Sequence, residues 1–504
     1  MPSNIHKIAI NTIIQYVELI LNVLIGLFSV RLILSALGAS DYGIYDLIGG
    51  VIALLGFITT TLSQTSMRFL SVSLGDEKNS NTKQIFSSCF WMHIAIGGII
   101  ALLLAVVGLF LFDGALNIPS DRLFAAQSVY YFMIASLFMN ISTTPFLALL
   151  YSHEQFVFVS CLKIVDSVLK LLIAIAISIY ADEKLVLYGM LMAGVTAFDS
   201  ACYITFSLVK YRVEISIYIA SFKPIKSIAS FAGWTILDVM GGLATRQGYA
   251  VLLNCFFGTI MNATFALARQ IEGHLYTISA SVINSFKPQI MKSHGAGDND
   301  RMFRLSMSAG KMGFSMMSII AIPLLVLMPE VLSLWLKEVP NGTVLFSRLM
   351  VVACMCEQLT RGLVYANQAT GNIKWFSISI SAIRMLALPL SWISFKFGAP
   401  AHVAIVIFLG CETIGSASRV YIFSRITDFN AYNFVKMLFK HILPPFTISL
   451  AACIAVHQLA TDVTGVVITT LVAVFLYLTL VYSIGLTKQE KMAIESIFGH
   501  YSSL

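Results

Sequence analysis

Among the ionisable side chains inside the long apolar segments of this 504-residue chain, fifteen stand out as candidates to bind a charged ligand or carry a proton. The acidic ones are Glu18, Asp46, Asp166, Asp199, Asp238, Glu272, Glu357 and Glu412, and the basic ones are Arg31, Lys163, Lys170, Arg246, Arg269, Arg361 and Arg384. If the segments cross a membrane, each charge near its centre costs roughly 2.5–3.5 kcal/mol on insertion. We therefore expect these groups to face one another or to line water.

Spacing predicts ion pairs for several of these residues. Residues four apart share one face of a helix, and residues at equal depth on neighbouring segments can meet. The predicted sets are Glu357 with Arg361, Arg384 with Glu412, and Lys163, Asp166 and Lys170 as one polar stripe. For each set two interpretations stand, structural pairing and direct contact with a ligand.

Arg246 and Arg269 form the strongest candidate for an anion site. Counted along a helix, they lie about 18 Å and 14 Å from the outer ends of two adjacent segments. Two guanidinium groups at similar depth would clamp a phosphate or pyrophosphate bidentately. The competing interpretation is that Glu272, one turn from Arg269, neutralises it.

Two further carboxylates, Glu18 and Asp238, lie about 15 Å from the inner ends of their segments. Desolvated carboxyl groups of this kind bind H⁺ or Na⁺ in transport proteins. Pairing with a neighbouring basic side chain is the alternative interpretation.

The segments that position these residues are membrane-spanning helices. A mean hydropathy of +0.85 excludes a soluble globular protein, and apolar runs of about 20 residues or more suffice to cross the hydrocarbon core. The sequence predicts an all-α polytopic membrane protein with about 14 spans. Their limits are 8–37, 43–70, 85–112, 122–150, 156–180, 185–209, 226–257, 260–286, 303–328, 343–369, 373–396, 401–424, 436–460 and 464–486.

Basic residues in the connecting loops predict the orientation, because Lys and Arg concentrate on the cytoplasmic side. With the N-terminus inside, seventeen basic residues lie in cytoplasmic segments, Lys78, Lys287 and Lys488 among them. The external loops hold only Arg122, Lys184, Lys337 and Lys396. Both termini are therefore expected in the cytoplasm.

The chain also repeats itself after about 220 residues. Over residues 5–101 the repeat needs no gap; identical partners include Gly38/Gly258, Ser73/Ser293, Gly75/Gly295 and Ile99–Ala101/Ile319–Ala321, and Glu18 falls opposite Asp238. This predicts two parallel, pseudo-symmetric lobes of six helices, 1–215 and 216–428. Residues 429–504 add two helices and a short cytoplasmic tail.

Several function classes find no support in the sequence. No phosphate-binding loop, serine-hydrolase motif or zinc-protease motif occurs, and no loop is long enough for a catalytic domain, so an enzyme is not expected. No metal site or cofactor is indicated, and the scattered basic residues do not suggest nucleic-acid binding. The eight cysteines all fall within expected spans and are interpreted as packing residues.

Three runs of sequence resemble a known family: Arg31–Tyr45 (RLILSALGASDYGIY), Thr65–Ser71 (TSMRFLS) and Phe286–Asp298 (FKPQIMKSHGAGD). They are similar to bacterial polysaccharide-biosynthesis flippases of the Wzx type. These belong to the multidrug/oligosaccharidyl-lipid/polysaccharide (MOP) superfamily, together with MATE exporters and lipid II flippases. The resemblance extends over essentially the whole chain.

The resemblance implies a fold of two rocking lobes in the bacterial inner membrane and a lipid substrate. That substrate is an undecaprenyl-pyrophosphate-linked oligosaccharide for O-antigen, capsule or exopolysaccharide, with polysaccharide polymerase and other assembly proteins as partners alongside membrane lipids. A cationic cavity would receive its pyrophosphate, and the expected residues are Arg246, Arg269, Arg31, Lys170, Arg361 and Arg384.

Coupling to Na⁺ or H⁺ is also implied, because drug-exporting relatives carry acids on the seventh and tenth spans. Asp238 and Glu357 occupy those spans here, and Glu18 is the repeat partner of Asp238. Three alternatives therefore stay open: an ion-coupled multidrug exporter, a lipid II flippase, and a scaffold that transports nothing.

Overall fold

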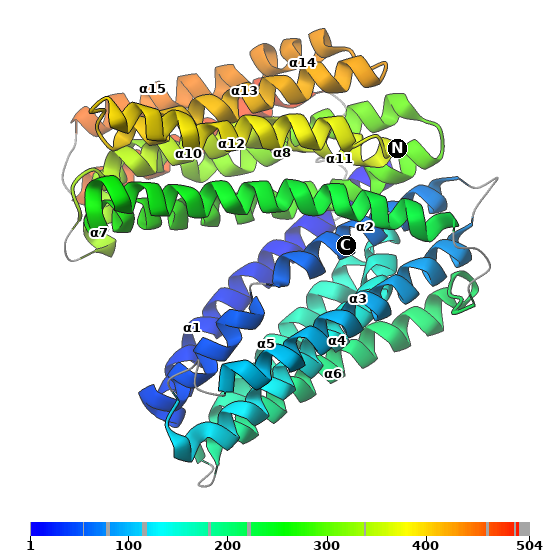
Figure 1. Ribbon diagram of the computed structural model, residues 1–504. Coiled ribbons are helices and arrows are strands. Elements are labelled where there is room, and N and C mark those ends of the chain that lie inside the picture. The colour runs from blue at the N-terminus through cyan, green and yellow to red at the C-terminus, as the bar shows by residue number, and fades with distance from the viewer. Residues whose placement is uncertain are drawn as a thin grey trace, which may run out of the picture. The chain divides into compact units, whose positions relative to one another are not determined.

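The computed structural model describes residues 2–53, 55–76, 81–112, 118–179, 183–218, 223–336, 339–459, 463–487 and 490–492 (Figure 1). Within these ranges every regular element is a helix. Lys78, Lys337 and Lys488, used above for the orientation, lie outside the described residues, as does the tail after Met492.

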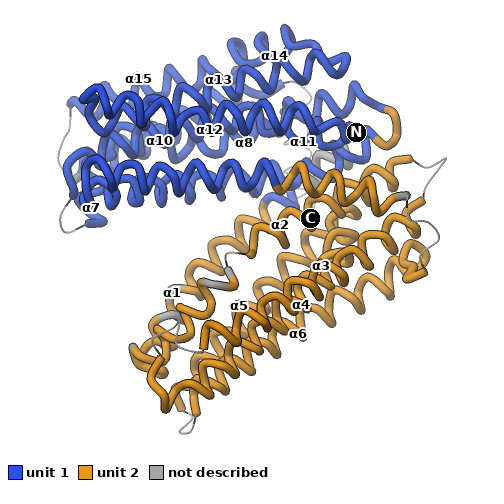
Figure 2. Tube along the Cα trace, viewed as in Figure 1, with its two compact units in different colours: residues 1–12, 237–294, 298–504 blue, residues 13–236, 295–297 orange. Residues whose placement is uncertain are grey.

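The chain separates into two compact units, coloured separately in Figure 2. The N-unit comprises residues 13–236 and 295–297, and the C-unit comprises residues 1–12, 237–294 and 298–504. The expected lobe limits at residues 215 and 428 stay a prediction.

The helices of the first half are α1 (Pro2–Ala53), α2 (Gly56–Gly75), α3 (Thr82–Phe110), η2 (Ser120–Arg122), α4 (Leu123–Ser152), α5 (Phe156–Ile179), α6 (Lys184–Tyr211) and η3 (Arg212–Glu214). The long helix α7 (Lys223–Gly295) follows. The remaining helices are α8 (Asn299–Val326), α9 (Met328–Trp335), α10 (Thr343–Leu359), α11 (Arg361–Thr370), α12 (Lys374–Lys396), α13 (His402–Ile426), α14 (Ala431–Met437), α15 (Leu443–Leu459) and α16 (Val463–Leu480), with π-helical turns η4 (Leu438–Ile442) and η5 (Val481–Gly485).

The internal repeat reappears in the helix boundaries. Helices α8, α10, α12 and α13 each begin 217 to 220 residues after α3, α4, α5 and α6, respectively. The packing partners repeat as well: α4 packs against α3 and α6, and α10 packs against α8 and α13. The sequence repeat therefore continues past residue 101, where identities become too sparse to follow.

Paired glycines break α1 and α7 at equivalent points. Gly38 has φ 77° and ψ 167°, and Gly258 has φ 79° and ψ −171°. This region of backbone space is essentially closed to residues with a Cβ atom, which explains why glycine recurs at both positions. Each break separates two of the expected spans, 8–37 from 43–70 and 226–257 from 260–286.

Eleven of the described helices are long and apolar enough to cross a membrane, which makes the chain a multi-pass membrane protein. The described parts of the other three expected spans, 43–70, 156–180 and 260–286, are helical, but these spans are not among the eleven. Helix α5, for example, carries Lys163, Asp166 and Lys170 within eight residues. The total of fourteen spans therefore stays a prediction.

Helix α4 is central to the packing of the N-unit, where it packs against α2, α3 and α6. In the N-unit, Tyr130 of α4 is 1% exposed and donates a hydrogen bond to the Leu104 carbonyl of α3 at 2.6 Å.

All eight cysteines are free thiols. Cys89, Cys354, Cys411 and Cys453 pack in the core as expected, but Cys161 and Cys255 are exposed, so interpreting every cysteine as a packing residue was wrong.

The last two long helices, α15 and α16, pack on α8, and ion pairs lie near both ends of this contact. Lys311 of α8 pairs with Glu490 after α16, and Glu330 of α9 lies 3.3 Å from the His457 ring of α15. Lys311 also donates to the Gly485 carbonyl at 3.2 Å. These contacts fix the added helix pair to the C-unit.

Candidate functional site: a charged pocket in the C-unit

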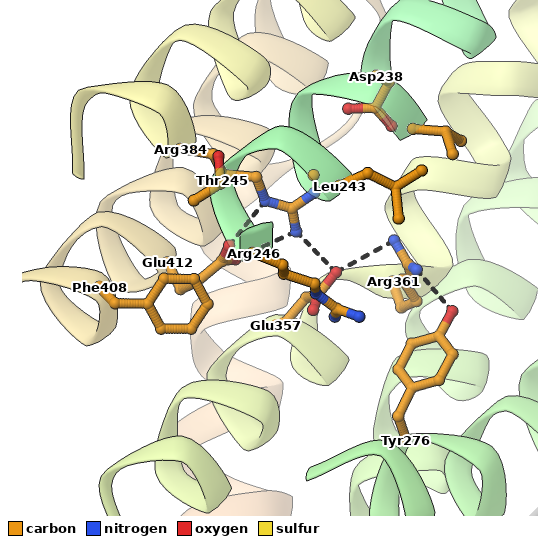
Figure 3. A pocket seen from close by; sticks show the side chains of 12 residues that line it. Asp238, Leu243, Thr245, Arg246, Tyr276, Glu357, Arg361, Arg384, Phe408 and Glu412 are labelled. Atoms are coloured by element: carbon orange, nitrogen blue, oxygen red, sulfur yellow. Dashed lines mark hydrogen bonds and ion pairs between the residues drawn. The ribbon is translucent and has the colours of Figure 1, made fainter. Parts of the chain in front are cut away.

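A cavity of about 210 Å³ lies inside the C-unit, where helices α7, α10, α11, α12 and α13 meet (Figure 3). It is smaller than the pockets of roughly 300–1,000 Å³ that hold drug-sized ligands. The charged residues that line it are Asp238, Arg246, Glu357, Arg361, Arg384 and Glu412. Three cations and three anions therefore share a space fit for one small polar group.

A break between α10 and α11 places two of these residues. The helices meet at Thr360, so Glu357 ends one helix and Arg361 begins the next. Gly362 then packs against α8 so closely that a Cβ atom would lie 1.9 Å from the Ser306 carbonyl oxygen. This contact fixes the start of α11 and hence the base of Arg361.

Glu357 is the centre of the ion network. It is 7% exposed, and its Oε1 atom lies 3.2 Å from Arg361, 2.7 Å from Arg384 and 3.9 Å from Arg419. The predicted pairing of Glu357 with Arg361 is present, with two further guanidiniums added. A buried carboxylate needs such partners, because an unpaired charge in this environment is costly.

Arg384 of α12 ties two carboxylates together. Its Nε donates to Glu412 at 2.7 Å, and its Nη2 donates to Glu412 at 3.2 Å and to Glu357 at 2.7 Å. The predicted Arg384–Glu412 pair is therefore present, in the bidentate geometry that planar guanidinium favours. With its donors so engaged, Arg384 holds the pocket together rather than offering a free binding group.

Arg246 is the guanidinium most open to a ligand. Its side chain is 40% exposed, and its Nη2 donates to Glu272 at 3.1 Å. In the competing interpretation Glu272 neutralises Arg269, but no described carboxylate lies within 4.0 Å of Arg269. Arg269 instead lies over the Phe265 ring at 5.9 Å and does not line the cavity.

The structure adds to the site two residues that sequence reasoning did not select, Tyr276 and Arg419, and a third, Glu412, that it had placed only in an ion pair. Tyr276 of α7 accepts a hydrogen bond from Arg361 Nη2 at 2.7 Å, and Arg419 donates to Thr360 at 3.0 Å. Glu412 was predicted as a partner of Arg384 but not as a site residue. Helical spacing could have found two of them, because Tyr276 follows Glu272 by four residues and Arg419 follows Glu412 by seven.

Asp238 lies at another edge of the cavity (Figure 3). Ser381 of α12 donates to its Oδ1 atom at 3.3 Å. No described basic residue lies within 4.0 Å of this carboxylate. Of the pocket's acids, Asp238 is thus the one best placed to bind a cation.

The other predicted site residues lie in the N-unit. Glu18 pairs with Lys163 at 3.2 Å and accepts a hydrogen bond from Ser160. Lys170 pairs with Asp166 at 2.8 Å, and Arg31 is exposed. The structure thus brings together Arg246, Arg361, Arg384, Asp238 and Glu357, and places Arg31, Lys170 and Glu18 elsewhere.

The donor set suits anions better than metals. No group of three His, Cys, Asp or Glu side chains among the described residues is arranged to hold a metal ion. Arginine groups facing a partly dry cavity bind phosphate or carboxylate strongly, because water screens them little. Each arginine that lines the cavity, however, has a carboxylate within 4.0 Å, so the lining is balanced in charge rather than cationic as expected.

Comparison with solved structures places this geometry in a known fold. A MATE transporter in the bent conformation matches with a TM-score of 0.73 and 12% identity, over 86% of this chain and 98% of that chain. An outward-facing multidrug resistance MATE family transporter of the MOP superfamily matches with a TM-score of 0.70 and 14% identity, over 84% and 95%. The chain has the fold of MATE transporters.

A third match is the Vibrio cholerae MATE transporter VcmN in the bent form, with a TM-score of 0.65, 17% identity and coverage of 84% and 96%. No family model matches the sequence, and no curated protein matches it. The expected MATE-like fold is confirmed, and these neighbours are transporters rather than enzymes.

Proposed function

We propose that the chain is a flippase that moves undecaprenyl-pyrophosphate-linked oligosaccharide repeat units from the cytoplasmic to the periplasmic leaflet of the bacterial inner membrane. The observation that carries this proposal is the set of three arginines, Arg246, Arg361 and Arg384, around one cavity of a MATE fold. A pyrophosphate is the charged group that all lipid-linked oligosaccharides of this class share. Alternating access would carry it across.

Arg246 would make the first contact with the pyrophosphate. Among the described residues only Glu272 bonds it, at one nitrogen, and the remaining N–H groups would be available to two phosphate oxygens. The phosphate would then compete with Glu272 for the guanidinium. Arg384 would stay bound to Glu357 and Glu412 and keep the pocket in shape.

Two features of the whole chain favour a lipid-linked substrate over a free drug. The runs Arg31–Tyr45, Thr65–Ser71 and Phe286–Asp298 resemble polysaccharide flippases. The MATE structures also leave about a seventh of this chain unmatched, and helices α15 and α16 follow the six helices of the second repeat. The resemblance assigns such added helices to the lipid tail.

An ion-coupled multidrug exporter is the second candidate, and one observation favours it. Asp238 of α7 and Glu357 of α10 line the same cavity, as the coupling acids of drug exporters would. Glu357, however, is held by three guanidiniums, which oppose a second cation there. In this candidate Na⁺ or H⁺ would bind at Asp238, or at Glu18 in the N-unit.

Deletion of the gene tests the proposal in the source bacterium. We expect surface polysaccharide to disappear while lipid-linked repeat units accumulate on the cytoplasmic side. Normal surface polysaccharide with increased drug sensitivity would favour the exporter, and arrest of growth at the stage of cell-wall synthesis would favour a lipid II flippase. Complementation by a well-expressed Arg246→Ala variant would favour a scaffold.

A further inference from the structure

A buried lysine outside the pocket has no counter-ion among the residues that the structure describes. Lys287 lies in the last turns of α7, beyond the expected span 260–286, and its side chain is 2% exposed. No described carboxylate lies within 4.0 Å of its Nζ atom. Every arginine that lines the cavity has such a carboxylate. Lys287 therefore differs from these arginines in lacking a described acidic partner.

The surroundings of Lys287 partly stabilise its charge and partly oppose it. Its Nζ atom lies 4.8 Å from the centre of the Tyr365 ring, a cation–π contact. The other group that acts on it is the Arg361 guanidinium, which repels it; both residues belong to α11. On α8, which also packs against α11, the buried cation Lys311 is already paired with Glu490.

These surroundings favour the neutral amine. Burial, and then repulsion by Arg361, lower the pKa of Lys287 to about 7. An arginine at this position would keep its proton at any physiological pH, whereas a lysine can lose it. Lysine rather than arginine at this buried position, with no described carboxylate beside it, therefore allows the charge to be gained and lost.

We propose that Lys287 is a proton-binding site of the C-unit, which takes up and releases H⁺ during the transport cycle. The proposal rests on the transport function proposed above and names H⁺ as the coupling ion. Lys287 does not line the 210 Å³ cavity, and a proton is the ligand that needs no cavity. Two of the three carboxylates considered for coupling, Glu357 and Glu18, already have basic partners, which leaves Asp238 as the alternative site.

Arg361 connects this site to the pocket. Its guanidinium bonds Glu357 through Nη1 at 3.2 Å and Tyr276 through Nη2 at 2.7 Å. A proton on Lys287 places a second positive charge beside Arg361 and repels its guanidinium. Loss of the proton removes this repulsion, so the charge of Lys287 biases the ion network that lines the cavity.

Direct titration of the wild-type protein tests the site without any substrate. Protein labelled with [¹³Cε]lysine is titrated by NMR in detergent micelles, and the Lys287 resonance is assigned by its absence from Lys287→Arg and Lys287→Met. We expect a midpoint near neutral pH, about three units below the 10.4 of free lysine. A Lys287 resonance that titrates only above about pH 10 would overturn the proposal.

Thermal stability provides a second test. With a folded-state pKa below the unfolded value, Lys287 makes the folded protein more stable as pH rises from about 7 toward 10. Lys287→Met should abolish this rise, whereas Lys436→Met, at an exposed position of α14, should retain it. Identical pH profiles for wild type and Lys287→Met would contradict the proposal.

A transport assay distinguishes the failure of this proposal from the failure of the flippase proposal. In proteoliposomes with a fluorescent polyprenyl-pyrophosphate oligosaccharide, we expect the wild-type rate to depend on the pH gradient and the Lys287→Arg rate not to. Unchanged gradient dependence in Lys287→Arg would refute the coupling role. If wild type moves no lipid, the flippase proposal fails, while the NMR titration still decides the proton site.

Discussion

Removal of Arg384 should be among the most destabilising changes in the C-unit. In Arg384→Met, Glu412 loses the hydrogen bonds of 2.7 and 3.2 Å that neutralise it, whereas Glu357 keeps Arg361 and Arg419. The Glu412 side chain is 5% exposed, so one carboxylate is left buried and uncompensated. Breaking one partner of a buried pair costs about 3–5 kcal/mol, and we expect a loss in that range.

The double variant distinguishes the ion pair from simple packing. Adding Glu412→Gln to Arg384→Met removes the stranded charge and should recover about 1–3 kcal/mol, which is the coupling energy of contacting residues. The free energy of unfolding is measured by reversible denaturation in mixed micelles. Arg31→Met, at an exposed position, is the control and should change it by less than about 0.5 kcal/mol. A loss below about 1 kcal/mol in Arg384→Met, or no recovery in the double variant, would refute this account of the pocket.

Three further predictions concern the fold and the C-terminal helix pair. Gly258→Ala should cost about 1–3 kcal/mol of unfolding free energy, because φ is 79° at this position. The control Gly26→Ala, at a helical glycine with open space around it, should not have this cost. Equal effects of the two substitutions would contradict the strain argument. Burial raises the pKa of Glu490, but its ion pair with Lys311 outweighs this and holds the pKa below its usual value. Because this pKa is depressed, the stabilisation by Glu490 is present above about pH 4.3 and is lost as pH falls further. Wild type and Glu490→Gln should therefore converge in stability under acid. A difference that stays constant with pH would exclude the ion pair as the source of the stabilisation. Lys311→Met should strand Glu490 and lower stability by about 3–5 kcal/mol, and Lys311→Met/Glu490→Gln should restore much of it; a neutral single variant would contradict the burial of this pair.

The sequence predicts those parts of the site that follow from position along a helix. Glu357 and Arg361 are four residues apart, and the pair forms although a helix break at Thr360 lies between them. The repeat also anticipates the equivalent breaks at Gly38 and Gly258, because only glycine tolerates that backbone conformation.

Ion pairs between separate helical segments are harder to predict. Glu272 pairs with Arg246 and not with Arg269, its neighbour three residues away on the same helix. Both arrangements satisfy the same charge balance, and the choice depends on how residues 237–258 of α7 face its later turns. Arg419 was missed because a basic residue late in a span resembles an orientation signal, yet it is 1% exposed and bonds Thr360.

Charged residues within a helix make it harder to identify membrane spans from the sequence. Helix α5 has the length and the apolar character of a span, but it carries a stripe of three charged residues, more than the apolar stretch of any of the eleven helices. The structure shows why the stripe is tolerated: Lys163 pairs with Glu18 of α1, and Lys170 pairs with Asp166. Such compensation becomes visible only when neighbouring helices are in place.

Translocation in proteoliposomes tests the central claim most directly. Wild type, Arg246→Ala and the N-unit control Arg31→Ala are reconstituted with a fluorescent polyprenyl-pyrophosphate oligosaccharide, and the label reaching the opposite leaflet is measured with a membrane-impermeant quencher. The account predicts movement by wild type and Arg31→Ala, and a loss of about ten-fold or more in a folded Arg246→Ala protein, as for one charged hydrogen bond of about 1.5–3 kcal/mol. Movement by Arg246→Ala at the wild-type rate, or none by wild type in either direction of an ion gradient, would contradict it.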